Sequence, residues 1–270
     1  MQKTILITGS TDGIGLETAK MLVSLGHHVL IHGRSAAKLA AAEEMLSQLP
    51  DAGPVESYEC DLSRIADVEA FAVAVAAKHQ KLDVLINNAG VYNVSQATTQ
   101  DKLDVRFVVN TIAPYLLTQR LMPLLGTSAR VVNLSSAAQA PVDLTALASS
   151  NAGSSDGMVY AQSKLAITMW STELAEVLKD KGPSVVSVNP ASMLGSKMVK
   201  EAYGVTGGDL GIGADILCRA ALSEEFADAS GKYFDNDSGR FAAPHPDALD
   251  TAKNRKLVAA IEKILAEKTL

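Results

Sequence analysis

The chain has 270 residues, of which 47% are hydrophobic and 20% charged, an ordinary balance for a globular protein with a sizeable core. The net charge of −6 and the sequence pI near 5.4 argue against nucleic acid or an anionic membrane surface as the main partner. No apolar stretch is long enough to span a bilayer. The two cysteines, Cys60 and Cys218, lack disulfide or metal-ligand spacing, so we expect a protein of the reducing cytoplasm.

Short β-branched or aliphatic runs alternate with longer segments of helical periodicity. The predicted strands are residues 4–8, 29–32, 55–60, 84–87, 130–134, 184–188 and 231–234. The helical segments are at about 13–25, 35–48, 63–79, 100–125, 158–180 and 209–222. This alternation predicts a three-layer, doubly wound α/β fold, in which a seven-stranded parallel sheet is covered by helices on both faces.

No linker divides the chain, so we expect residues 1–270 to form a single domain that ends in a C-terminal helix within 246–270. The apolar residues of that helix share one stripe and are Leu257, Ile261, Ile264 and Leu265. Such a stripe serves equally well as internal core or as the face of a homo-oligomer.

Two irregular segments interrupt the alternation, at residues 138–157 and 189–208. Each follows a predicted strand, and open α/β sheets bind ligands at the carboxyl ends of their strands. We therefore expect both segments to be active-site loops that wall the substrate pocket or act as a lid. The alternative is that each is a tolerated surface insertion.

The run "ILITGSTDGIGLETA" combines a buried strand, a glycine-rich turn and the start of a helix. Glycine is needed where backbone turns sharply and approaches a pyrophosphate, and the free N–H groups of the helix then face the phosphates. The predicted nucleotide-binding residues of this loop are Gly9, Ser10, Thr11, Asp12, Gly13, Ile14 and Gly15. Asp12 sits where it can cap the helix.

The second strand ends in "LIHGRS", which bears on the choice of cofactor. An NAD site needs a carboxylate here for the ribose 2′-hydroxyl, but the position is held by Gly33, and Arg34 follows. Arg pairs with a 2′-phosphate and stacks on adenine, which favours NADP over NAD. The alternative for Arg34 is a solvated side chain at a strand end.

Four ordered motifs identify a family resemblance: "TGSTDGIG", "NNAG" at 87–90, "NLSS" at 133–136 and "YAQSK" at 160–164. With these motifs the chain, from residue 3 to about 235, resembles the short-chain dehydrogenase/reductase family. The resemblance implies a Rossmann fold, a homodimer or homotetramer, and hydride transfer between NAD(P) and a carbonyl/alcohol pair. A longer loop before "YAQSKLA" and a "GKYF" strand also resemble the retinol-dehydrogenase-like branch, which hints at a bulky apolar substrate.

The catalytic residues that the resemblance implies are Asn110, Ser136, Tyr160 and Lys164. Tyr160 matches the acid/base and Lys164 its partner, while Ser136 matches the serine that holds the substrate oxygen. Asn110 matches the residue that anchors a proton-relay water. Hydride arriving at a carbonyl carbon leaves an alkoxide that needs a proton. A cation one helical turn from a tyrosine lowers the pKa of that acid toward the working range.

The resemblance also implies contacts with the cofactor. Their residues are Asp61 and Leu62 at the adenine, Asn88, Ala89 and Gly90 beside the adenosine, Tyr160 and Lys164 at the nicotinamide ribose, and Pro190 and Met193 at the nicotinamide. The chain departs from the family pattern after the sixth strand, where the usual Pro-Gly is Pro190-Ala191 and the usual threonine is at best Ser196.

Three rival interpretations use other features of the sequence. "GSSDG" at 153–157 matches the nucleophile elbow of serine hydrolases, but no strand precedes it and the only later histidine is His245. His28 and His32 lie four apart on a predicted strand without a visible third ligand, so we expect a partly exposed strand face rather than a metal site. The third interpretation is a non-catalytic NADP-binding regulatory or sensor protein. Such proteins typically lose the tyrosine or the lysine, whereas this chain has both.

Overall fold

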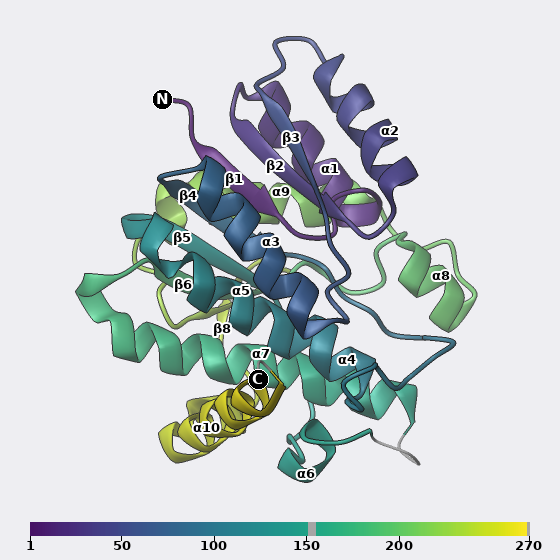
Figure 1. The fold of residues 1–270 in the computed structure, drawn as a ribbon, viewed down its shortest axis with the longest axis vertical. Coiled ribbons are helices and arrows are strands. Elements are labelled where there is room, and N and C mark those ends of the chain that lie inside the picture. The colour runs from purple at the N-terminus through teal and green to yellow at the C-terminus, as the bar shows by residue number, and fades with distance from the viewer. Residues whose placement is uncertain (151–154, 269–270) are drawn as a thin grey trace.

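The computed structural model describes residues 1–150 and 155–268, which form one eight-stranded sheet between two layers of helices (Figure 1). The strands lie in the order β3-β2-β1-β4-β5-β6-β7-β8. The first seven are parallel to their neighbours, and β8 is antiparallel to β7. The predicted parallel sheet of seven strands is confirmed, and the structure adds a C-terminal antiparallel hairpin.

The strands are β1 (Thr4–Ile7), β2 (His28–Gly33), β3 (Val55–Glu59), β4 (Leu82–Asn87), β5 (Leu125–Leu134), β6 (Ser184–Asn189), β7 (Tyr233–Asp235) and β8 (Arg240–Ala242). The α-helices are α1 (Gly13–Ser24), α2 (Ala36–Ser47), α3 (Ile65–Lys78), α4 (Val105–Phe107), α5 (Ala113–Leu121), α6 (Leu144–Leu147), α7 (Asp156–Leu178), α8 (Lys197–Tyr203), α9 (Leu210–Leu222) and α10 (Thr251–Lys268). A π-helical turn, η1 (Val108–Ile112), joins α4 to α5. Short 3-10 turns occupy Met122–Leu124, Lys179–Lys181, Glu224–Phe226 and Pro246–Leu249.

Alternate residues of the strands pack into two separate hydrophobic cores, one on each face of the sheet. On one face, Ile5, Ile7 and Val29 pack with residues of α1, α2 and α9. On the other, Leu6 and Leu30 pack with residues of α3, α5 and α7. Because successive side chains of a strand point to opposite faces, strands that are buried on both sides appear in the sequence as continuous aliphatic runs.

The order of the strands reverses at β1, which pairs with β2 on one side and β4 on the other. Connections from β1 and β4 therefore diverge at their carboxyl ends, and a crevice opens where they separate. The glycine-rich loop leaves β1 and the "NNAG" segment leaves β4 at this point, so the fold brings both motifs to one edge of the sheet.

The C-terminal helix α10 lies alongside α7 (Figure 1). Leu257, Ile261 and Ile264 of its apolar stripe are buried in the same core as Trp170 of α7. Of the two roles that the sequence left open for the stripe, the structure favours internal core within one chain.

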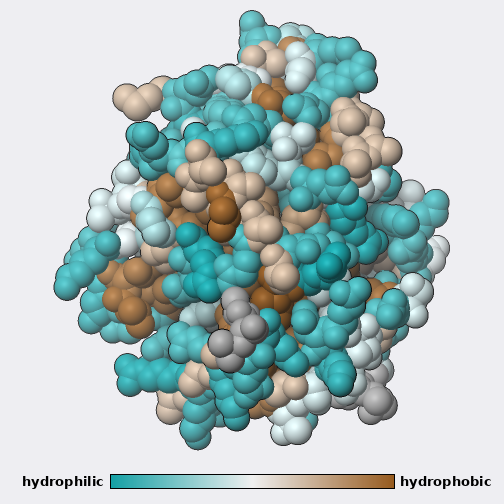
Figure 2. All heavy atoms as spheres, viewed as in Figure 1, coloured by the Kyte–Doolittle hydropathy of each residue, from teal (hydrophilic) through white to brown (hydrophobic). Residues whose placement is uncertain are grey.

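No helix among residues 1–150 and 155–268 is long and apolar enough to cross a membrane. On the face shown in Figure 2, hydrophilic side chains predominate and hydrophobic ones form separate patches.

Candidate active site

The glycine-rich loop is held close to the segment after β4. The amide of Asn88 donates hydrogen bonds to the carbonyl oxygens of Thr8 and Gly9, at 2.9 and 3.0 Å. Gly9 has a φ of +66°, in the left-handed region that favours glycine. A Cβ on Gly15 would lie 2.3 Å from the Gly9 carbonyl oxygen, so only glycine fits this approach of helix to loop.

The other residues of the loop have divided tasks. The carboxylate of Asp12 caps α1 by accepting from the Gly13 N–H, as the sequence predicted. Ser10 points inward, where its hydroxyl accepts from the main-chain N–H of His32 at 2.8 Å. Ser10 can therefore meet a cofactor only through its backbone. Ile14 packs toward Gly213 of α9.

His32 is buried, so the expected partly exposed strand face is wrong for this residue. Its Nδ1 accepts from the Gly9 N–H at 3.0 Å and its Nε2 lies 3.1 Å from the Cys60 carbonyl oxygen. Burial lowers the pKa of His32 to about 4, and the neutral ring therefore acts as a strut between the glycine loop and the end of β3. The ring also stacks on Phe71. Only tertiary contacts make this role visible.

A cavity of about 530 Å³ lies at the carboxyl ends of β2 and β3. Arg34, Cys60 and Asp61 line it, together with Arg64 at the start of α3. Leu62 is buried beside Asp61. Arg34 is exposed, and no ion pair joins it to any other group in the described ranges. The residues predicted for the adenine end thus surround one cavity with a free guanidinium at its rim.

Gly33 explains why no carboxylate occupies the end of β2. A Cβ at this position would lie 2.6 Å from the Thr11 methyl carbon of the glycine loop. A side chain at position 33 therefore requires the Thr11 side chain to move, and with glycine at this position Arg34 is the first side chain able to meet the ribose.

Asn110 stabilises the loop that follows β4. Its Oδ1 accepts from the Val91 N–H at 2.8 Å, and its Nδ2 donates to the Val91 carbonyl and to the Ser163 hydroxyl, each at 2.9 Å. The residue lies in the π-helical turn η1, a feature that frequently marks functional sites. Because these bonds occupy both ends of the amide, a relay water would have to meet the main chain of Asn110.

Ala89 and Gly90 complete this loop on the side of the crevice. Ala89 approaches Gly9 closely, since a Cβ added to Gly9 would lie 2.9 Å from the Ala89 Cα. A Cβ on Gly90 would lie 3.5 Å from the Lys164 ammonium nitrogen. The missing side chain keeps this space open next to the lysine.

Tyr160 and Lys164 lie one turn apart in α7, and Ser136 approaches them from the end of β5. The Lys164 Nζ is 5.7 Å from the centre of the Tyr160 ring. It donates to the Leu134 carbonyl oxygen at 2.8 Å. The Ser136 side chain lies near enough to the Tyr160 hydroxyl to lower its pKa. The structure therefore brings three of the four predicted catalytic side chains together, with Asn110 linked to them through Ser163, whose hydroxyl donates to the Tyr160 carbonyl at 2.7 Å.

The electrostatics of this pair are set by burial. Burial raises the pKa of Tyr160 to about 12, while the Ser136 side chain works in the opposite direction. Burial lowers the pKa of Lys164 to about 8. At neutral pH the tyrosine is therefore protonated and the lysine still mostly charged, which suits an acid beside a cation.

Ser136 is positioned by residues that sequence reasoning missed. The Tyr233 hydroxyl of β7 donates to the Ser136 carbonyl oxygen at 3.1 Å, and the Gln139 amide donates to the same atom at 3.0 Å. Tyr233 lies in the "GKYF" strand, which the sequence flagged only as a resemblance.

Two further tyrosines, Tyr92 and Tyr203, extend the aromatic cluster that begins at Tyr160. The rings of Tyr92 and Tyr160 have centres 4.8 Å apart, and Tyr203 of α8 lies 6.1 Å from Tyr92. Tyr203 is 55% exposed although it is a large side chain. The segment 189–208 therefore contains a short helix that places an aromatic ring near the candidate acid, as expected for a pocket wall.

The loop after β6 is strained. Ala191 has a φ of +110° and Met193 one of +56°, in the region that favours glycine. The Asp237 carboxylate accepts from the N–H and hydroxyl of Ser192 at 2.7 and 2.6 Å and holds this loop. Pro190 is buried, whereas Met193 is 43% exposed. Ser196 caps α8, so its hydroxyl is already engaged.

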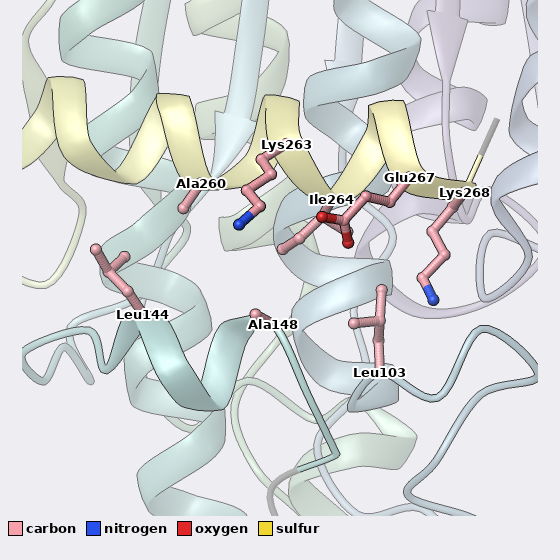
Figure 3. Close-up of a pocket in the computed structure, with 8 residues that line it drawn as sticks. All are labelled: Leu103, Leu144, Ala148, Ala260, Lys263, Ile264, Glu267 and Lys268. Atoms are coloured by element: carbon pink, nitrogen blue, oxygen red, sulfur yellow. The ribbon is translucent and has the colours of Figure 1, made fainter. Parts of the chain in front are cut away.

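The segment 138–157 divides between two places. Its first part packs against α7, where the Asp143 N–H donates to the Gln162 side chain at 2.9 Å. Its helix α6 lies beside α10, where Leu144 and Ala148 face Lys263 and Ile264 across a second cavity of about 270 Å³ (Figure 3). None of the predicted cofactor or catalytic residues lines that cavity.

The elbow motif at 153–157 falls partly outside the described residues. Within them, Ser155 caps α7 by accepting from the Met158 N–H. The position of the supposed nucleophile thus serves the start of a helix.

The chain is similar in sequence and in fold to known proteins. Residues 3–204 match the sequence model described as short chain dehydrogenase. Retinol dehydrogenase 13 of Homo sapiens is 30% identical over 281 residues, which cover 97% of this chain and 84% of that protein. An uncharacterised protein from Mycobacterium paratuberculosis has a crystal structure with a TM-score of 0.82 at 28% identity, covering 98% of this chain and 94% of its own. A metagenomic short-chain oxidoreductase in complex with NADP gives a TM-score of 0.61 at 29% identity, covering 80% and 88%.

Proposed function

The chain belongs to the short-chain dehydrogenase family and acts on alcohol or carbonyl groups with NAD(P), and from that premise we propose that it is an NADP-preferring carbonyl reductase with Tyr160 as its acid. The observation that carries the proposal is the convergence of Tyr160, Lys164 and Ser136 beside a glycine loop whose close approach excludes side chains.

The residues present fit a dinucleotide. A Cβ on Gly9 would collide with Ala89 and one on Gly15 with the Gly9 carbonyl, so these glycines let the loop pack tightly against the segment after β4. A Cβ on Gly13 would meet nothing within 4 Å, which leaves this part of the loop open beside the backbone N–H groups at the N-terminus of α1. The unpaired guanidinium of Arg34 and the absence of a carboxylate at Gly33 support recognition of a 2′-phosphate over a free hydroxyl. The cofactor supplies a hydride to the carbonyl carbon when it is bound.

The chain's own residues handle the oxygen and the proton. Ser136 donates a hydrogen bond to the substrate oxygen, in the manner of an oxyanion hole. The Tyr160 hydroxyl transfers its proton to that oxygen. The charge of Lys164 then stabilises the tyrosinate that remains. Asn110 holds the loop after β4 through Val91 and offers its main chain to a relay water.

The protonation state of Tyr160 supports a role in the reduction of a carbonyl. Tyr160, with its pKa raised to about 12, is a protonated acid at neutral pH, which suits reduction of a carbonyl. The alternative, a non-catalytic NADP-binding regulatory or sensor protein, has no use for a buried lysine whose pKa is lowered to about 8 next to that tyrosine.

The surroundings of Tyr160 favour a bulky apolar substrate. Tyr92 contacts the Tyr160 ring, and Met158, Met193 and Tyr203 are large exposed side chains on the elements that surround it. The relative named retinol dehydrogenase 13 carries a similar implication by its name. We also propose a cytoplasmic homodimer or homotetramer, since family membership implies such assembly and both cysteines are free thiols.

The test is turnover of a panel of aliphatic and aromatic aldehydes and ketones with NADPH and with NADH. We expect Tyr160→Phe to lower kcat by about 10²–10⁴-fold while NADPH still binds, as measured by fluorescence titration. Tyr115→Phe is the matched control, because the Tyr115 hydroxyl bonds Glu262 of α10, away from the site. Activity of Tyr160→Phe equal to that of the unaltered protein would refute the mechanism, and NADPH binding without turnover of any carbonyl would favour the sensor alternative.

A further inference from the structure

Three side chains with metal-ligand chemistry converge at the amino-terminal ends of β2 and β3. They are His28 at the start of β2, Glu56 in β3 and His79 at the end of α3. One nitrogen of each histidine and one carboxylate oxygen lie within 4.8 Å of one another. The predicted cofactor residues lie at the carboxyl ends of the strands, and this cluster lies at the opposite end of the sheet.

The register of the sheet brings the first two ligands together. Leu30 of β2 pairs with Glu56 of β3, so His28, Leu30 and Glu56 project from the same face. That face is covered by α3, whose C-terminal cap is His79. The sequence pairs His28 with His32 by spacing, but in the folded chain His32 braces the glycine loop and His28 meets Glu56 and His79 instead.

The distances approach those of a metal site. The His28 Nε2 is 3.1 Å from one Glu56 oxygen, and the His79 Nε2 is 3.5 Å from the other. Tetrahedral zinc with Zn–N and Zn–O bonds near 2.1 Å holds its ligand atoms about 3.4 Å apart. The ligands therefore need only small side-chain rotations to close around an ion.

An unpartnered atom points to a missing ligand. The His28 Nε2 is buried and has no hydrogen-bond partner of acceptable geometry within the described chain, although the carboxylate is near. A buried imidazole nitrogen without a partner loses its hydration with no compensation, and a coordinate bond restores it. The three side chains are 11–31% exposed, which leaves a path for an ion.

The surrounding groups are compatible with a cation. The Tyr58 hydroxyl donates to Glu56 at 3.2 Å and lies 3.1 Å from the His79 Nε2, so its contact with this nitrogen has to open when an ion binds there. Lys78 lies 3.6 Å from Glu56 and opposes a second positive charge, but its side chain is 62% exposed and free to swing into solvent.

We propose that His28, Glu56 and His79 form a divalent metal site, selective for Zn²⁺, with water in the fourth position. Two imidazoles and one carboxylate are a ligand set that zinc accepts in tetrahedral geometry. The ion would tie β2, the edge strand β3 and the end of α3 together. Its role is therefore structural, and it is independent of the proposed reaction.

The full chain is first stripped of metal with EDTA and dialysed. It is then titrated with ZnCl₂ by calorimetry and, separately, with Co²⁺ by visible absorption. We expect one equivalent to bind and the melting temperature to rise. His28→Gln and His79→Gln should each weaken binding by at least about 10-fold, more than an outer-shell change costs. The matched control His27→Gln alters the adjacent histidine, whose Nδ1 instead accepts from Lys3, and should bind as the unaltered protein does.

Two results would overturn the proposal. One is the absence of a saturable equivalent, and the other is binding that persists in both histidine variants, which would assign the ion to other groups such as the thiols. Glu56→Gln reports on the same site from a different strand if a histidine variant fails to fold, as checked by circular dichroism. Turnover with NADPH should be unchanged in His28→Gln, so that failure of this site and failure of the proposed activity are separable.

Discussion

The ammonium of Lys164 donates a 2.8 Å hydrogen bond to the main-chain oxygen of Leu134, at the point where β5 delivers Ser136 to the site. The side chain is 4% exposed and has no carboxylate among the causes that shift its pKa. Within the described residues the fold therefore carries a buried cation that one main-chain oxygen solvates and no carboxylate neutralises, an energetic cost that catalysis explains.

Lys164→Met should abolish turnover and yet stabilise the protein. Burial lowers the pKa of Lys164 from its usual 10.5 to about 8, so removing the charge should stabilise the native state by about 3 kcal/mol at neutral pH. Loss of the hydrogen bond to Leu134 offsets about 1–2 kcal/mol of that gain. The unfolded chain binds more protons between pH 8 and 10.5. Over that window the stability of the unaltered protein should therefore rise with pH relative to the variant. Urea unfolding of both proteins at pH 7 and pH 10 measures this, and a variant less stable at every pH would contradict it.

Arg34→Ala should reduce the preference for NADPH. Loss of a charged hydrogen bond to the 2′-phosphate is expected to raise the KM for NADPH by about 10–100-fold and to leave that for NADH nearly unchanged. Arg64→Ala is the matched comparison, because Arg64 lines the same cavity but is paired with Asp67 at 3.4 Å. Equal effects on both cofactors would show that Arg34 contacts only the adenine.

Ala191→Gly should stabilise the protein by about 1 kcal/mol, because Ala191 holds a φ of +110° that favours glycine. Thermal unfolding followed by circular dichroism gives the difference. Ala76→Gly, at an exposed position inside α3, has the same chemical change and should cost about 1 kcal/mol instead. Destabilisation by Ala191→Gly would show that the backbone conformation of Ala191 does not lower the free energy of unfolding.

Tyr233→Phe should lower kcat by a few fold without changing the KM for NADPH. The lost hydroxyl leaves the Ser136 carbonyl with one fewer donor, so the serine is oriented less well toward the substrate oxygen. Steady-state kinetics with a carbonyl substrate separates the two constants. Tyr115→Phe removes an equivalent hydroxyl from a bond to Glu262 and should leave both constants unchanged, whereas equal losses in the two variants would point to general destabilisation.

Long-range neighbours explain what could not be read from the sequence. His32 appeared as half of a histidine pair, but its partners Gly9 and Cys60 lie in the glycine loop after β1 and just after β3. Tyr233 meets Ser136 across 97 residues of sequence. Neither contact leaves a periodic signal, because it depends on the order in which strands pair.

The sequence by itself determined the alternation of strands and helices, the glycine loop, and the one-turn spacing of Tyr160 and Lys164. Each of these follows from local periodicity and local turn chemistry. Only the tertiary structure decided that α10 covers α7, that Asn110 clamps Val91, and that His28 meets Glu56 and His79. The physical reason is that strand order and register bring together residues far apart in the chain, whereas periodicity constrains only near neighbours.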